Sequence, residues 1–119
     1  MGLERVYIDQ NDFISIELFS DDEVYILRDS SSREFIGISV LSVHDTNPIR
    51  FKVVDKYQGH GYGKQILKES LEIMKNKGYD KVVFTVKRSD AILIKVIHDL
   101  GGEFLSNRGD LAQYVIYLD

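Results

Sequence analysis

Hydrophobic periodicity divides this 119-residue chain into a first half of strands and a second half in which helices alternate with strands. Short apolar, β-branched runs separated by polar turn clusters predict an antiparallel meander, with strands over 13–19, 23–28, 35–43 and 49–54. From Gly63 to Met74 the apolar residues recur at helical spacing, which predicts an amphipathic helix. Gly78 stands where a glycine commonly ends a helix.

The remaining segments predict a strand over 80–86, a second helix over 90–100 and a closing hairpin of strands 103–105 and 111–118. Ser89 is expected to cap the second helix, and since that helix is apolar on most faces we expect it to be largely buried. The order predicts a single α+β domain over 1–119, a mixed, mostly antiparallel twisted sheet with two helices. A right-handed crossover through the first helix implies one locally parallel strand pair.

Composition narrows the function classes. The chain has no cysteine, which excludes a disulfide scaffold and a thiolate nucleophile or metal site. No apolar run approaches the length of a membrane span and no signal pattern opens the chain, so we expect a cytoplasmic protein with no membrane partner. An isoelectric point near 5.3 and the lack of a basic, aromatic surface pattern argue against nucleic acid as a partner.

The formal net charge of −4 hides an asymmetry between the two halves. Residues 1–46 carry ten acidic and three basic residues, whereas residues 47–119 carry nine acidic and twelve basic ones. Either this is chance scatter of solvated charges, or the second half meets an anion and the first half meets a cation or water. Charge counts alone leave both readings open.

One glycine-rich turn, Tyr57 to Lys64 (YQGHGYGK), lies between a predicted strand and a predicted helix. Glycines at alternate positions let the backbone approach a ligand closely, and N–H groups at a helix start favour an anion, so a phosphate is the expected guest. The third glycine comes one residue too early for a dinucleotide fingerprint. Walker A spacing also fails, since Gln65 follows Lys64. A turn that merely connects two elements is the alternative.

The pattern Gln58-x-x-Gly61-x-Gly63, placed between strand and amphipathic helix, resembles the acyl-CoA-binding motif of the GNAT superfamily of N-acyltransferases, Arg/Gln-x-x-Gly-x-Gly/Ala. The order of later elements extends the resemblance over residues 23–119. The resemblance implies an N-acetyltransferase that moves an acetyl group from acetyl-CoA to a primary amine by direct attack. It implies no metal and a small-molecule or peptide amine as acceptor. Separately, the closing strand is expected at an end of the sheet, which makes it a candidate edge for a homodimer.

The same resemblance implies roles for individual residues. Backbone N–H groups of the glycine-rich turn would hold the CoA pyrophosphate, and backbone groups of Val53 and Val54 would bond the pantetheine arm. An N–H near Val53 would stabilise the oxyanion. Asp90 falls where many members have a pantetheine-contacting asparagine. The implied cofactor-binding residues are Val53, Val54, Gln58, Gly59, His60, Gly61, Tyr62, Gly63, Lys64 and Asp90.

The chain departs from the family at three places. The tyrosine that protonates the leaving thiolate is replaced by Ile97 or, with the register shifted by one, by His98, which is then the candidate for a catalytic acid. No general base stands out, because His44, Asp45 and Asp55 are more typical of loop residues. Only three residues separate predicted strands 13–19 and 23–28, so the usual helix pair that walls the acceptor site is missing or replaced.

These departures leave the acceptor pocket open, rudimentary or completed by a second subunit. They also leave an alternative open, in which the chain is a catalytically silent acyl-CoA-binding or regulatory module. If the chain is an active enzyme, the basic half holds every expected CoA contact and the acidic half contains the acceptor side. That distribution favours a cationic amine as acceptor.

Overall fold

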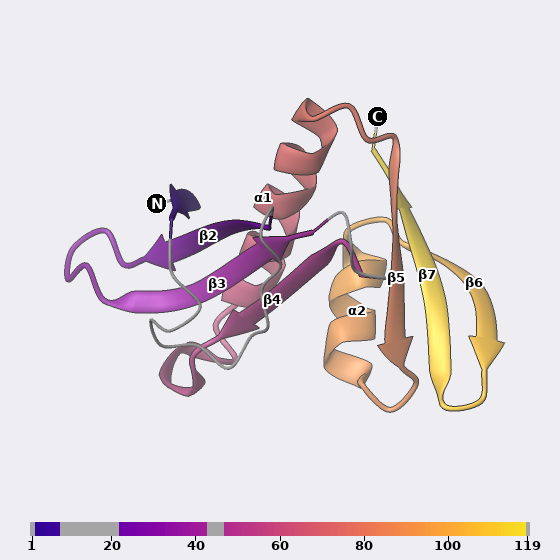
Figure 1. Cartoon of the computed structure of the whole chain (residues 1–119). Coiled ribbons are helices and arrows are strands. Elements are labelled where there is room, and N and C mark those ends of the chain that lie inside the picture. Colours follow the sequence, from indigo (N-terminus) through magenta and orange to yellow (C-terminus); the bar gives the residue numbers. More distant parts are fainter. Residues whose placement is uncertain (1, 8–21, 43–46, 119) are drawn as a thin grey trace.

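The computed structural model describes residues 2–7, 22–42 and 47–118, in which two antiparallel sheets and two helices form an α+β fold (Figure 1). The first sheet has the strand order β1 (Glu4–Val6), β2 (Glu23–Arg28), β3 (Phe35–Leu41), β4 (Ile49–Val53). The second has the order β5 (Lys81–Lys87), β7 (Leu111–Tyr117), β6 (Glu103–Arg108). The helices are α1 (Tyr62–Asn76) and α2 (Ala91–Asp99), and a short 3₁₀ turn, η1 (Asp55–Tyr57), precedes α1.

The predicted α+β class is confirmed, but the predicted parallel strand pair does not form a ladder. β4 and β5 flank α1 in sequence and run in the same general direction, yet they belong to different sheets and diverge from one another (Figure 1). Within the described residues each strand pairs on one side only, β4 with β3 and β5 with β7, and both pairings are antiparallel. The unpaired edges of β4 and β5 therefore face a common space.

α1 forms where the periodicity predicts it. Its apolar stripe is buried, and the helix ends at Lys77 and Gly78, whose φ of 99° is a left-handed conformation that glycine adopts without a steric cost. One polar residue of the buried face is satisfied locally, since Ser70 Oγ donates to the carbonyl of Ile66 at 2.7 Å and lies 2.7 Å from Ser39 Oγ of β3. This contact fixes α1 against the first sheet.

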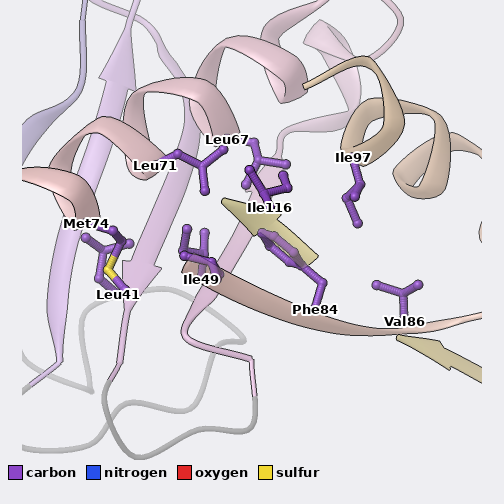
Figure 2. Close-up of a cluster of buried hydrophobic side chains, with 10 residues drawn as sticks. Leu41, Ile49, Leu67, Leu71, Met74, Phe84, Val86, Ile97 and Ile116 are labelled. Carbon is purple, nitrogen blue, oxygen red and sulfur yellow. The ribbon is translucent and has the colours of Figure 1, made fainter. Parts of the chain in front are cut away.

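A single apolar cluster joins the two sheets (Figure 2). Leu41 and Ile49 come from the first sheet, Phe84 and Ile116 come from the second, and α1 lies between them with Leu67 fully buried. Side-chain packing, rather than strand pairing, therefore holds the second sheet, and β5 within it, to the first sheet. A second cluster, formed by Val24, Ile26, Ile38 and Val40, lies on the face of the first sheet away from α1.

α2 is less buried than its composition predicts. Ile97 alone of this helix is buried, whereas Ile92 is 81% exposed. The predicted cap is also displaced by one residue, because Asp90 rather than Ser89 caps the helix and its carboxylate accepts from the N–H of Leu93 at 3.1 Å. Ile97 of α2 packs into the core, whereas other apolar side chains of this helix face the space beside β4.

The closing hairpin turns at Gly109, whose φ is 59°, as its sequence predicts. Its second strand, β7, lies in the middle of the sheet and β6 lies at the edge, so the expectation that the closing strand is a free edge for a homodimer is wrong. β7 is central because it pairs with β5 and β6 at once.

The sequence patterns gave no sign of β1, which is only three residues long and pairs with β2. The predicted strand 13–19 lies outside the described residues. The stretch between β1 and β2 therefore spans residues 7–22 rather than the three residues that the sequence pattern indicated. Among the described residues, neither helix has the length and apolar character that crossing a membrane requires.

Candidate functional site

A cleft of about 640 Å³ lies between β4 and β5. β4 forms one wall and the second half of β5 the other, while Asn47 lies at one end and the glycine-rich turn at the opposite end. The first turn of α1 and the start of α2 complete the lining, to which Ile92, Leu93 and Val96 contribute apolar side chains. The cleft thus combines an apolar passage with a mouth made of glycine backbone.

Backbone polarity on the β4 wall follows from its pairing with β3. The N–H of Val54 donates to the carbonyl of Ile36 at 2.9 Å, and in an antiparallel pair alternate residues bond to the same neighbour. The peptide groups of Phe51 and Val53 therefore point away from β3 and into the cleft. The carbonyl of Val53 accepts from Gln58 Nε2 at 3.0 Å, which leaves the N–H of Val53 directed at the cleft.

Val54 lies outside the cleft lining, unlike Val53. Its N–H is bonded to β3, its carbonyl accepts from the N–H of Tyr57 at 2.9 Å, and it does not line the cleft. Because bonding alternates along a strand, only one residue of the Val53–Val54 pair can present its backbone to the cleft. That residue is Val53.

On the β5 wall, too, alternate peptide groups point away from the strand with which it pairs. The N–H of Leu118 donates to Asp80 and the N–H of Arg88 donates to Asp110, both at 2.8 Å, so the even-numbered residues of β5 bond to β7. Val83 and Thr85 therefore direct their peptide groups away from β7, and of the two Thr85 lines the cleft. The N–H of Thr85 donates to Asn47 Oδ1 at 2.7 Å, a side-chain bond that links β5 to the residues just before β4.

Replacing Asn47 with alanine is expected to loosen this end of the cleft. The loss of the acceptor leaves the part-buried Thr85 N–H unsatisfied, which costs about 1–2 kcal/mol of unfolding free energy. Hydrogen exchange of the Thr85 amide should accelerate, and Asn47→Asp, which keeps an acceptor oxygen, should restore most of its protection. Unchanged exchange of that amide in Asn47→Ala would show that the bond does not hold β5.

The glycine-rich turn places N–H groups at the cleft mouth. Gly59 and Gly61 adopt left-handed φ values of 81° and 83°, and Gly61 is the N-cap of α1. In the described part of the chain no side chain caps α1, and the first turn of a helix has N–H groups without intrahelical partners. The side-chain amide of Gln58 donates to the carbonyl of Val53 and to Asp55 Oδ1, which ties the turn to the end of β4. The mouth therefore presents backbone donors at the positive end of a helix dipole.

Most of the residues that the sequence singled out come together here. The cleft lining includes eight of them, namely Val53, Gln58, Gly59, Gly61, Tyr62, Gly63, Lys64 and Asp90. His60 lies in the same turn but outside the lining. Neither position proposed for a catalytic acid reaches the cleft, because Ile97 is buried in the core and His98 is exposed on α2 outside the lining.

The charged groups of the lining are mostly cationic. Among the described lining residues, Arg50, Lys52 and Lys64 are basic and Asp90 alone is acidic. Arg50 Nη2 lies 3.2 Å from Asp22 Oδ2, whose side chain is 1% exposed, and Lys64 Nζ lies 4.0 Å from Asp99. Within the described ranges no group of three or more His, Cys, Asp or Glu side chains is arranged to hold a metal ion.

Tyr57 lines the cleft and donates its hydroxyl hydrogen bond to the carboxylate of Glu34. This bond raises the pKa of Tyr57 to about 12, with a smaller contribution from desolvation. The same bond, together with that from Lys56, holds the pKa of the Glu34 carboxyl below its ordinary value. The phenol therefore stays protonated near neutral pH and cannot act as a general base there.

Comparisons with known proteins agree with this geometry. Residues 3–101 match the family model described as acetyltransferase (GNAT) family. A Bacillus subtilis acetyltransferase in complex with CoA superposes with a TM-score of 0.69 at 17% identity, over 82% of this chain and 78% of that one. A GNAT acetyltransferase from Elizabethkingia anophelis with acetyl-CoA bound gives a TM-score of 0.65 at 24% identity, over 82% and 76%.

The spermidine N-acetyltransferase of Vibrio cholerae, a dodecamer, gives a TM-score of 0.72 at 11% identity, over 83% of this chain and 66% of that one. At these identities the likeness speaks for the fold. No curated protein matches the chain in sequence.

Proposed function

Because this chain belongs to the GNAT family of acetyltransferases, we propose that its cleft binds acetyl-CoA and passes the acetyl group to a primary amine. The observation that carries the proposal is the pair of unpaired strand edges, β4 and β5, that face one another with a backbone-donor mouth at one end. An extended ligand arm with amide groups can bond to such an edge as an added strand does. A diphosphate at its end suits the glycine-rich mouth.

The CoA pyrophosphate would accept hydrogen bonds from N–H groups of the turn that runs from Gly59 to Lys64. The left-handed glycines and the uncapped first turn of α1 support this assignment, and Lys64 adds a positive charge beside them. The pantetheine arm would lie between β4 and β5, with Val53 as its backbone partner and Ile92, Leu93 and Val96 against its apolar parts.

The acetyl carbonyl would then meet the N–H of Val53, which stabilises the oxyanion as the amine attacks. A C–N bond forms and the C–S bond breaks, the amine releases its proton to solvent, and the CoA thiolate takes a proton from solvent. In our proposal water accepts the proton of the amine and supplies the proton of the thiolate, since neither Ile97 nor His98 lines the cleft. The acceptor is a small-molecule or peptide amine, and the proposed assembly is a homodimer.

Amine-dependent release of free thiol from acetyl-CoA tests the proposal. We expect thiol to appear in proportion to acetylated amine, identified by mass, with a rate that rises as pH approaches the pKa of the amine because only the free amine attacks. Saturable acetyl-CoA binding without transfer to any amine or peptide of a broad panel would instead favour a catalytically silent acyl-CoA-binding or regulatory module. Absence of acetyl-CoA binding would refute both.

A further inference from the structure

We infer that the acceptor carries an anionic group, such as a carboxylate, that binds beside Lys52 and Arg50 on β4. This inference rests on the proposed function, and it differs from the cationic acceptor that the charge of the whole first half favours. It follows from which side of β4 the acceptor can approach and from the charges that it meets there.

The two faces of β4 are distinct. Phe51 and Val53 pack against the cluster that contains Ile66 of α1, so they mark the face that α1 covers. Arg50 and Lys52 alternate with them and therefore project from the opposite face, where Arg50 pairs in register with Val40 and Lys52 with Ile38. The glycine-rich mouth belongs to the start of α1 and would be filled by the donor. An amine must reach the acetyl group from the side of Arg50 and Lys52.

Arg50 is held in place on that side. Its guanidinium forms an ion pair with the almost fully buried carboxylate of Asp22 at 3.2 Å. The charges of Arg50 and Asp22 offset one another, so this pair adds no net negative charge that would attract a cationic amine.

Lys52 supplies the net charge. It is exposed, it lines the cleft, and no carboxylate of residues 2–7, 22–42 or 47–118 forms an ion pair with its ammonium group. Its ammonium is therefore available to an incoming anion. Lys52 lies two residues along β4 from Arg50, and their side chains project from the same face of the strand. The ammonium of Lys52 suits a carboxylate or a similar small oxyanion.

The facing wall is polar and uncharged. Gln113 Nε2 donates to Thr85 Oγ1 at 3.4 Å, and Ser106 Oγ donates to Gln113 Oε1 at 3.3 Å, so these three part-buried side chains form a row that begins at the cleft. Such groups can orient a polar acceptor but do not offset the positive charge of Lys52. The described walls of the acceptor side therefore favour an amino acid or a related anionic amine over a polyamine.

Three amines of equal length test this inference: 4-aminobutyrate, n-butylamine and 1,4-diaminobutane, which end in an anion, a methyl group and a cation. We expect the wild-type protein to have its lowest KM for 4-aminobutyrate. Lys52→Gln should raise that KM about fivefold and leave the KM for n-butylamine unchanged. Lys52→Glu should reverse the preference in favour of 1,4-diaminobutane. Lys68→Gln, an exposed lysine of α1 outside the cleft lining, is the control.

A second readout does not need turnover. With CoA bound, 4-aminobutyrate should raise the Tm of the wild-type protein saturably but not that of Lys52→Glu. Transfer that prefers 1,4-diaminobutane in the wild type, or a KM for 4-aminobutyrate that Lys52→Gln leaves unchanged, overturns this inference while the proposed function stands. If acetyl-CoA binds and no amine is acetylated, the proposed function fails and the Tm series alone decides whether the anion site exists.

Discussion

Replacing Gly63 with valine is expected to raise the Kd for acetyl-CoA by about 100-fold or more while the protein stays folded. Gly63 lies in the first turn of α1 and lines the cleft mouth. A Cβ built there would lie 3.6 Å from the Phe51 ring and 3.9 Å from Val53 Cγ2, which are ordinary contacts. The branches of valine would fill the space that a phosphate needs to reach the N–H groups, and losing two charge-assisted bonds accounts for the expected loss.

Titration calorimetry with acetyl-CoA and urea unfolding of the same samples separate binding from stability. Gly63→Ala is the matched control, expected to weaken binding less and to leave stability near that of the wild type. Gly61 makes a poorer test, because its φ of 83° strains any larger residue whether or not a ligand is bound. Wild-type affinity in a folded Gly63→Val protein would refute the assignment of this turn to the pyrophosphate.

Replacing Gly37 with alanine is expected to lower the free energy of unfolding by about 3 kcal/mol, the high end of the cost of overpacking a core. Gly37 pairs in register with Val53 of β4 and lies beneath α1. An added Cβ would lie 2.7 Å from Ile66 Cδ1 and also 2.7 Å from the backbone carbonyl oxygen of Lys52. A side chain can rotate away, but relieving the second contact requires β4 itself to move.

Urea unfolding measures the first effect, and acetyl-CoA affinity measures the displacement of β4, since Val53 belongs to the cleft wall. The equal change at Gly63, glycine to alanine, controls for the general effect of adding one methyl group near the same cleft. A Gly37→Ala protein of wild-type stability would mean that β4 is less tightly fixed between β3 and α1 than the 2.7 Å contact indicates.

The sequence predicted the parts of this site that depend on local chemistry. The apolar stripe of α1, its end at Gly78 and the glycine-rich turn are each contained within a few neighbouring residues, so periodicity and glycine spacing suffice to find them. The separation of β4 from β5 could not be predicted in that way, because it depends on which strands bond to which across the fold. The same holds for the central place of β7.

Other misses have equally physical causes. Apolar residues around α2 look the same whether they are buried in a core or line a cleft, so the exposure of Ile92 was not predictable from composition. Val53 and Val54 have the same side chain, and only the register with β3 shows which of them presents its backbone to the cleft. Asn47 before Pro48 reads as an ordinary turn signal until Thr85 is seen bonded to it.

The junction between the two sheets has a mechanical consequence. A hydrogen-bonded ladder fixes the distance and the angle between two strands, whereas apolar contact is non-directional and tolerates small rotations. β5 is joined to the first sheet by the shared apolar cluster and by the Thr85–Asn47 bond. Because β5 and β4 belong to different sheets, the end of β5 that is distant from Asn47 can rotate relative to β4. The gap beside Val53 can therefore change width without breaking any strand pairing, so in the proposed function side-chain packing sets the width of the acyl site.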